Sequence, residues 1–340
     1  MRQKPAVRGE DRLPEIHGLF LLAKEQGTTA QTERKNAERQ KFCRLHAGQT
    51  PSVPVESKAL YVRTKQATTT SELLRWGAAR LRGHPEPVRE ARRALALACG
   101  ADGLLPERLS PFEAGRFRRL VEARARGLPW PALEGSTAFL DFEVLVPPGV
   151  FVPRPETEEL AELALRVWRE LPGRPRALDW GTGTGVLALA LAKARPEAEV
   201  WALDVSARAV AAARRNAQRL GLRLRVLRSP SFARVSEKFH LIVANPPYVP
   251  TPQIPALPKD VRACDPRRAL DGGPDGLRWI RELLERGPEF LFPGGFLLME
   301  IGHGQGGAVL DLAGRVGAWA EARILRDLSG KPRFFWGRRC

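Results

Sequence analysis

From residue 154 onward, short apolar segments alternate with stretches of helical periodicity. The strand candidates are residues 176–179, 200–204, 224–227, 240–244 and 295–301. Between such segments, residues 158–171 carry one apolar face, formed by Leu160, Leu163, Val167 and Leu171. Parallel strands need crossover helices, and regular alternation of this kind is typical of that arrangement. The sequence therefore predicts an α/β fold with a mostly parallel, doubly wound sheet.

The chain before this region divides into three predicted parts. Residues 1–68 are rich in Lys, Gln and Thr without sustained periodicity, which predicts a disordered extension or, alternatively, a basic arm that binds RNA. Residues 69–135 show helical spacing and a capping box at Ser110 and Glu113, which predicts a small helical domain. Residues 136–152 alternate apolar and polar side chains, which predicts a β-hairpin linker to a domain at 153–340.

Composition excludes several classes of function. The four cysteines are scattered without a Cys-x-x-Cys pair, so we expect reduced thiols and no metal site. We find no secretory signal and no apolar run long enough to span a membrane, so we expect a cytoplasmic protein. The formal net charge of +17 suggests a polyanionic partner. No zinc-finger or basic-zipper pattern accompanies it, which disfavours direct nucleic-acid binding without excluding it.

A glycine-rich turn follows the first predicted strand. It comprises Gly181, Thr182, Gly183, Thr184 and Gly185. Such a turn lets the backbone approach a ligand closely, but its G-x-G-x-G spacing departs from the G-x-G-x-x-G of dinucleotide sites. Asp179 before the turn suits a cationic ligand. Asp204 ends the next strand, where a carboxylate can accept hydrogen bonds from ribose hydroxyls; the alternative is a helix N-cap. These features favour a nucleoside ligand other than NAD.

The fourth predicted strand runs directly into Asn245, Pro246, Pro247 and Tyr248. The two prolines could simply end the strand. However, ligands of open α/β sheets bind at this carboxyl edge, where an amide and an aromatic ring are placed. The Asn245 side-chain oxygen and the Pro246 carbonyl can accept the two N–H groups of a planar amide, and Tyr248 can stack on it. We therefore predict transfer of a methyl group from the sulfonium of S-adenosylmethionine to an amide or amine nitrogen.

Three further segments extend the comparison to a known family. They are residues 151–158 (Phe-Val-Pro-Arg-Pro-Glu-Thr-Glu), residues 265–277, and Glu300-Ile301-Gly302 with Gln305. Together with Asn-Pro-Pro-Tyr, they make residues 70–340 resemble the protein-(glutamine-N5) methyltransferases of peptide chain release factors, the HemK/PrmC type. The resemblance implies a Rossmann-like class I methyltransferase sheet preceded by a small helical domain and a linking hairpin.

The resemblance also implies roles for individual residues. S-adenosylmethionine would contact the turn from Gly181 to Gly185, together with Asp204 and Asn245. The substrate glutamine, in a Gly-Gly-Gln motif of the release factor, would contact the segment Asn245–Tyr248, with the helical domain helping to hold the partner. The expected setting is cytoplasmic and ribosome-proximal. Asn245, Pro246 and Tyr248 are the expected catalytic residues.

Some positions depart from the family pattern or carry two interpretations. The family usually has an acidic residue, often followed by an aromatic one, after the third strand, where this chain has residues 228–232. Ser231 or Phe232 is the candidate for the adenine side, and we assign it to Ser231. Asp265 stands where the family tends to have Glu. Arg154 and Glu156 either start a helix or shape the entrance to the substrate pocket.

Two other functions remain open from the sequence. An RNA or DNA amino-group methyltransferase shares the Asn-Pro-Pro-Tyr element and would suit the basic charge. The helical region before residue 154 favours the glutamine enzyme over it. A nucleoside-binding scaffold without catalysis is disfavoured by the intact Asn245 and glycines.

Overall fold

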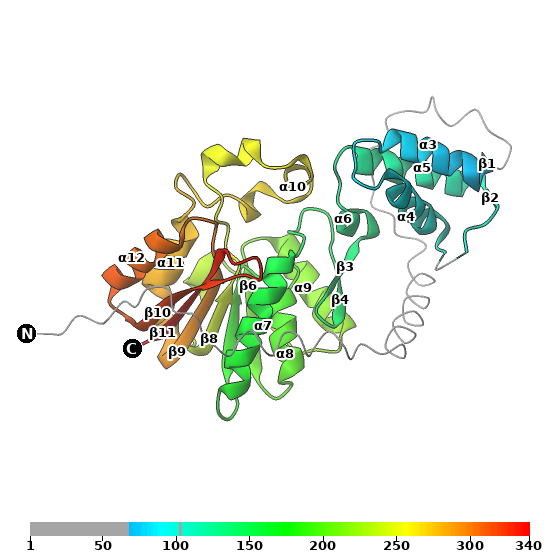
Figure 1. The fold of residues 1–340 in the computed structure, drawn as a ribbon. Helices are drawn as coiled ribbons and strands as arrows, with labels where there is room; N and C mark the ends of the chain where they lie inside the picture. The colour runs from blue at the N-terminus through cyan, green and yellow to red at the C-terminus, as the bar shows by residue number, and fades with distance from the viewer. Residues whose placement is uncertain (1–67, 102–103) are drawn as a thin grey trace, which may run out of the picture. The chain divides into compact units, whose positions relative to one another are not determined.

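The computed structural model describes residues 68–101 and 104–340 (Figure 1). The predicted extension at 1–68 lies outside the described residues except for its last position. The described chain forms two compact units, residues 68–133 and residues 134–340. No helix in these two ranges is both long and apolar enough to cross a membrane.

The first unit is helical. Its elements are β1 (Thr68–Thr69), α3 (Thr70–Arg80), α4 (Pro87–Cys99), β2 (Arg108–Leu109), α5 (Pro111–Ala125) and α6 (Trp130–Glu134). The predicted capping box starts α5: the Ser110 amide donates to Glu113 at 2.8 Å, and the Glu113 amide donates to the Ser110 hydroxyl at 3.3 Å. The helices bury a single apolar core that includes Leu73, Leu95, Phe117 and Val121.

The helix α3 approaches its neighbours closely at Gly77. A Cβ atom at this position would lie 2.7 Å from the Phe117 ring and 3.1 Å from the Ala91 methyl. Phe117 is fully buried, so its ring has little room to move away. The glycine therefore permits the close packing of α3 on α4 and α5.

We expect Gly77→Ala to lower the free energy of unfolding by about 1–2 kcal/mol, because overpacking outweighs the gain in helix propensity. Gly115→Ala is the matched control: it is also in a helix, and its nearest contact would be a flexible arginine at 3.6 Å. That change should stabilise by about 0.5–1 kcal/mol. Chemical denaturation followed by circular dichroism measures both. Equal effects of the two changes would contradict this packing argument.

The second unit is built on a seven-stranded sheet in the order β10-β11-β9-β8-β5-β6-β7. Strands β7 (Arg225–Arg228), β6 (Glu199–Asp204), β5 (Arg176–Trp180), β8 (Phe239–Ala244) and β9 (Leu291–Glu300) are parallel. Strands β11 (Pro332–Arg339) and β10 (Trp319–Arg326) add an antiparallel edge. The predicted α/β class and doubly wound sheet are confirmed. The antiparallel pair was not predicted, because its many arginines obscure the apolar pattern.

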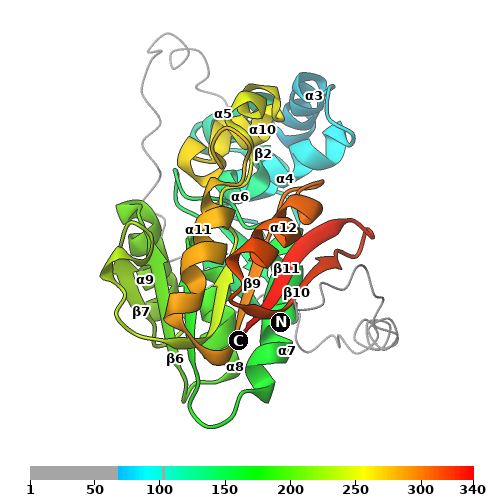
Figure 2. The same cartoon turned by 90° about the vertical axis from the view of Figure 1, so that its left-hand side faces the viewer.

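Helices cover both faces of this sheet (Figure 2). The helices α7 (Pro155–Glu170), α8 (Val186–Ala194) and α9 (Ala207–Arg219) share one core with Leu241 and Val243. The helices α11 (Arg278–Arg286) and α12 (Gly306–Val316) share the other core with Ile242 and Leu297. Successive residues of one strand thus enter opposite cores, which is why the central parallel strands β5, β6 and β8 are largely apolar. A short helix, α10 (Lys259–Cys264), lies in the connection after β8.

The predicted hairpin consists of β3 (Ser136–Phe139) and β4 (Phe142–Leu145). Its apolar side chains join the core shared by α7 and α8. Asn216 of α9 fixes it there: its side-chain oxygen accepts the Leu145 amide at 2.8 Å, and its nitrogen donates to the Leu145 carbonyl at 3.1 Å and to Thr184 at 2.9 Å. One buried amide thus joins the hairpin to the turn after β5.

Candidate active site

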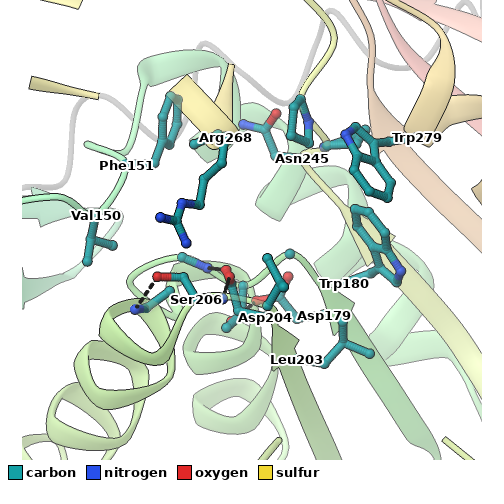
Figure 3. A pocket seen from close by; sticks show the side chains of 18 of the residues that line it. Val150, Phe151, Asp179, Trp180, Leu203, Asp204, Ser206, Asn245, Arg268 and Trp279 are labelled. Carbon is teal, nitrogen blue, oxygen red and sulfur yellow. Dashed lines mark hydrogen bonds between the residues drawn. The ribbon is translucent and has the colours of Figure 1, made fainter. Parts of the chain in front are cut away.

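A cavity of about 360 Å³ opens at the carboxyl ends of β5, β6 and β8 (Figure 3). This volume lies within the range of small-molecule sites. The predicted site residues in its wall are Asp179, Gly181, Thr182, Gly183, Thr184, Asp204, Ser231, Asn245, Pro246, Pro247 and Tyr248. Residues from three strand ends, far apart in the sequence, therefore meet at one site.

The turn after β5 has the backbone of a ligand cradle. Gly181 and Gly183 adopt φ angles of 75° and 57°, and a Cβ on either would meet nothing within 4 Å. Gly185 is different, and it does not line the cavity. A Cβ there would lie 3.1–3.2 Å from Ala213 of α9, so this glycine serves helix packing and not direct ligand contact.

Asp179 lies under the turn and is almost fully buried. One oxygen accepts the Thr182 hydroxyl at 2.6 Å and the Ala188 amide at 3.1 Å. Its other oxygen, Oδ1, is buried without a hydrogen-bond partner among the described residues. Burial raises the pKa of Asp179 to about 7. A cationic group that entered the cavity would stabilise the ionised carboxylate.

Asp204 lies at the end of β6 and is held by two backbone amides. Its oxygens accept Ser206 N at 2.8 Å and Gly183 N at 3.0 Å. Burial is the largest influence on its pKa, which is raised. The N-cap of α9 is Ser206, whose hydroxyl accepts the Ala209 amide at 3.4 Å. The alternative that Asp204 caps this helix is therefore wrong.

Aromatic side chains form another part of the cavity wall. The rings of Trp180 and Trp279 lie 5.8 Å apart, and the Trp180 indole donates to the Ser231 hydroxyl at 3.1 Å. Ser231 has an uncommon φ of 52° and lines the cavity. Phe232 instead stacks on Phe290 at 4.4 Å inside the core, so it contributes no side chain to the cavity.

Arg268 also lines the cavity. It falls within the family segment 265–277, but no role was predicted for it. Its guanidinium extends from the connection after β8 toward Asp204, between Phe151 and Ser206 (Figure 3). Its positive charge opposes the rise of the Asp204 pKa. It thus adds a cation on the side of the cavity where Asp204 supplies a carboxylate.

Asn245 is oriented by a hydrogen bond beneath the cavity. Its side-chain nitrogen donates to the Thr157 hydroxyl of α7 at 2.9 Å. Thr157 in turn donates to Glu300 Oε2 at 3.3 Å. Because the nitrogen is engaged by Thr157, the side-chain oxygen is left available as an acceptor.

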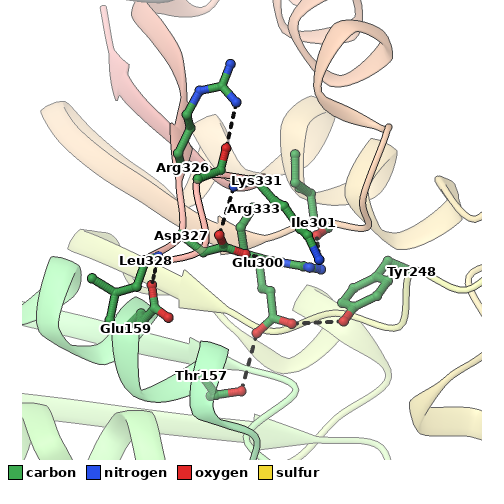
Figure 4. A network of polar contacts seen from close by, with 11 residues as sticks. Thr157, Glu159, Tyr248, Glu300, Ile301, Arg326, Asp327, Leu328, Lys331 and Arg333 are labelled. Atoms are coloured by element: carbon green, nitrogen blue, oxygen red, sulfur yellow. Dashed lines mark hydrogen bonds and ion pairs between the residues drawn. The ribbon is translucent and has the colours of Figure 1, made fainter. Parts of the chain in front are cut away.

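The same carboxylate holds Tyr248. The tyrosine hydroxyl donates to Glu300 Oε1 at 2.9 Å (Figure 4). Glu300 is buried at the end of β9, and burial raises its pKa to about 7. The carboxylate thus connects Asn245, through Thr157, with Tyr248. The sequence analysis included Glu300 and Thr157 only as members of family segments and predicted no role for either.

Arg154 and Glu156 do not line the cavity, although their neighbours Pro153 and Thr157 do. Arg154 precedes α7 and makes an ion pair with the buried Asp265, whose other oxygen accepts the Val152 amide at 3.1 Å. Glu156 lies in the first turn of α7, where its negative charge raises the pKa of Glu300. Both residues lie at the start of α7, as the first of the two interpretations expects, and the prediction that they shape the entrance to the substrate pocket gains no support from their positions.

Comparison with known proteins identifies the family. The model of the methyltransferase small domain matches residues 141–255. The release factor glutamine methyltransferase of Moorella thermoacetica is 42% identical over 261 residues, covering 74% of this chain and 92% of that protein. The Bacillus subtilis protein of the same name is 33% identical over 279 residues, covering 78% and 96%.

The chain belongs to the release factor glutamine methyltransferase family. A solved structure named protein-(glutamine-N5) methyltransferase (release factor-specific), from Alicyclobacillus acidocaldarius, is 29% identical and covers 55% of this chain and 94% of that one. Its TM-score is 0.37, so the family assignment rests on the sequence relatives.

S-adenosylmethionine is the cofactor that family membership implies, and the residues of the cavity suit it. The unpartnered oxygen of Asp179 suits an ammonium group, Asp204 suits ribose hydroxyls, and the open side of the glycine turn leaves room for a ligand. No group of three or more potential metal ligands occurs within 68–101 and 104–340.

We expect Glu300→Gln to lower kcat by about 10-fold or more at pH 8. The glutamine amide has only one acceptor oxygen, so the hydroxyl of either Thr157 or Tyr248 would face its NH2 group and lose its acceptor. In the wild type, kcat should rise from pH 6 to pH 8 as the Glu300 carboxyl, with its pKa raised to about 7, ionises. The variant should lose this rise. Methyl transfer measured over the pH range tests both statements.

The exposed Glu285→Gln is the matched control for this change and should keep the wild-type profile. Affinity for S-adenosylmethionine, measured by calorimetry, should stay within about 3-fold in both variants, because Glu300 does not line the cavity. A Glu300→Gln enzyme with wild-type kcat and an unchanged pH profile would contradict the role that we give to this network.

Proposed function

We propose that the protein transfers a methyl group from S-adenosylmethionine to the side-chain nitrogen (N5) of the glutamine in the Gly-Gly-Gln motif of peptide chain release factors. The observation that carries this proposal is the position of residues 245–248 in the same cavity as the glycine turn and Asp204. A family of relatives named for this reaction supports it.

The chemistry explains why this site has two acceptors in place of a strong base. A carboxamide nitrogen is a poor nucleophile, because its lone pair is delocalised into the carbonyl. The cofactor supplies a methyl group on a sulfonium, which needs a nitrogen held in line behind it. We assign the two substrate N–H groups to the Asn245 side-chain oxygen and the Pro246 carbonyl. Holding the reactants in this geometry removes much of the entropic barrier.

Orientation of these acceptors depends on the side chains around them. Thr157 holds the Asn245 nitrogen at 2.9 Å, which keeps the amide oxygen available to the substrate. Tyr248, held by Glu300, offers a ring on which the planar substrate amide can stack. The lining of Trp180, Trp279 and Phe151 limits water near the reacting atoms.

The described residues do not identify the surface that holds the release factor. We propose that the helical unit, residues 68–133, helps to hold the release factor, and that the enzyme works near the ribosome. The competing function, methylation of an amino group in RNA or DNA, uses the same tetrapeptide. The relatives favour the glutamine reaction, because all three are named release factor glutamine methyltransferase and each alignment covers most of this chain and most of the relative.

Methyl transfer to purified release factor tests the proposal directly. The assay uses labelled cofactor with wild-type release factor, its Gln→Ala variant in the Gly-Gly-Gln motif, and bulk RNA. We expect label only on the wild-type factor. Label on RNA but not on the factor would reject the glutamine reaction in favour of the nucleic-acid reaction.

We expect Asn245→Ala to reduce turnover by at least about 100-fold, because one preorganised polar contact to the reacting amide is lost. Binding of S-adenosylmethionine should weaken far less, since Asp179, Asp204 and the glycine turn remain. Steady-state kinetics and calorimetry on the same preparation separate the two effects. Nearly unchanged turnover would show that Asn245 does not aim the substrate.

A further inference from the structure

Positive charge in the second unit is concentrated in one short segment. Residues 134–340 hold 30 Lys and Arg against 24 Asp and Glu, a net charge of +6. Residues 205–238 alone hold nine against one, a net charge of +8. The rest of the unit therefore carries a net charge of −2. A uniformly arginine-rich composition does not produce such an uneven distribution.

This segment forms one edge of the sheet. It contains α9, the edge strand β7 and the turn Ser231–Arg234 that follows it (Figure 2). All nine cations are exposed. The cations lie on both faces of the sheet at this edge. Arg214 belongs to α9, which covers one face, and donates to the Val226 carbonyl at 2.8 Å. Arg225 lies on the other face, 3.8 Å above the ring of Trp201. We call this surface the basic edge.

Few of these charges are neutralised within the molecule. Arg219 pairs with Glu143 at 2.9 Å, and Arg225 approaches Glu237 at 4.0 Å. Among the described residues, no carboxylate lies within ion-pair distance of the other seven cations, which include Arg215, Arg223 and Lys238. Like charges at this density repel one another, so a polyanion that replaced their counterions would bind favourably.

Two simpler explanations account for only part of the basic edge. Charged side chains on an edge strand prevent pairing with other chains, but either sign of charge serves that purpose, and Arg215 and Lys238 lie outside the strand. A protein-docking surface has an apolar centre. Of the large hydrophobic side chains in this segment, Val205 is the exposed one, and it lies at the segment's end.

We propose that the basic edge binds the phosphate backbone of RNA, without reading its sequence. The surface is almost purely cationic and arginine-rich, and guanidinium groups pair well with phosphate. The segment also provides Ser206, Ser229 and Ser231 to the wall of the cavity, so bound RNA would lie near the active-site opening without occupying it. The basic edge carries no zinc-finger or basic-zipper motif, which is why the sequence alone disfavoured direct nucleic-acid binding.

The test is a charge-reversal triple variant in the full chain, Arg215→Glu, Arg223→Glu and Lys238→Glu. The matched control reverses three exposed cations elsewhere, Arg82→Glu, Arg169→Glu and Arg315→Glu, with the same change in net charge. Both variants keep residues 1–67, so any contribution of that basic segment is equal in the two. Binding to a fluorescein-labelled 20-base-pair RNA duplex is measured by anisotropy between 50 and 300 mM KCl.

The basic-edge variant should bind the duplex at least about 10-fold more weakly, and the slope of log K against log salt should fall by about 2. The control should change by less than about 3-fold. Methylation of free release factor should be equal in wild type and basic-edge variant, which separates this proposal from the proposed function. Thermal unfolding verifies that both variants fold.

Three results would overturn the proposal. The first is no RNA binding by the wild type at 50 mM KCl, and the second is an equal loss in the two variants. The third is a preference for an acidic protein, seen as a raised KM for release factor in the basic-edge variant or as tighter binding of poly-glutamate than of RNA. This third result would assign the basic edge to an acidic protein.

Discussion

The hydrogen bond from the Asn245 amide to Thr157 is the contact on which the geometry of the active site depends. It fixes which atom of Asn245 is offered to the substrate, and it does so through residues of two different elements, α7 and the end of β8. Glu300 extends the arrangement to β9 by accepting hydroxyls from Thr157 and Tyr248. Hydrogen bonds thereby connect three elements at the cavity: α7, the end of β8 and the end of β9.

The carboxylates of the site serve different tasks because their surroundings differ. Asp179 keeps a buried oxygen without a partner among the described residues, which suits a cationic ligand. Asp204 is held by two backbone amides at the tip of β6. Glu300 lies behind the cavity wall and acts through hydroxyl groups. Burial raises the pKa of all three carboxyl groups. For Asp179 and Glu300 the pKa rises to about 7, so the protonation of these two groups responds to pH near neutrality.

Much of the fold and half of the site could be predicted from local patterns. The central parallel strands β5, β6 and β8 carry apolar residues on both faces, and each binding element lies at or directly after the end of a strand: the glycine turn after β5, Asp204 at the end of β6, and residues 245–248 after β8. The β10–β11 pair was missed because its exposed charges break the alternation. Arg268 was missed because nothing in its local sequence shows that its connection folds over Asp204.

The sequence by itself determined the elements, the glycine turn and the Asn-Pro-Pro-Tyr segment, since these depend on residues that are adjacent in the chain. Only the tertiary structure decided how they are oriented. Asn245 and Thr157 are 88 residues apart, Thr157 and Glu300 are 143 apart, and Arg154 and Asp265 are 111 apart. The physical reason is that a hydrogen bond depends on distance and direction in space, whereas periodicity and spacing report only on neighbours in the chain.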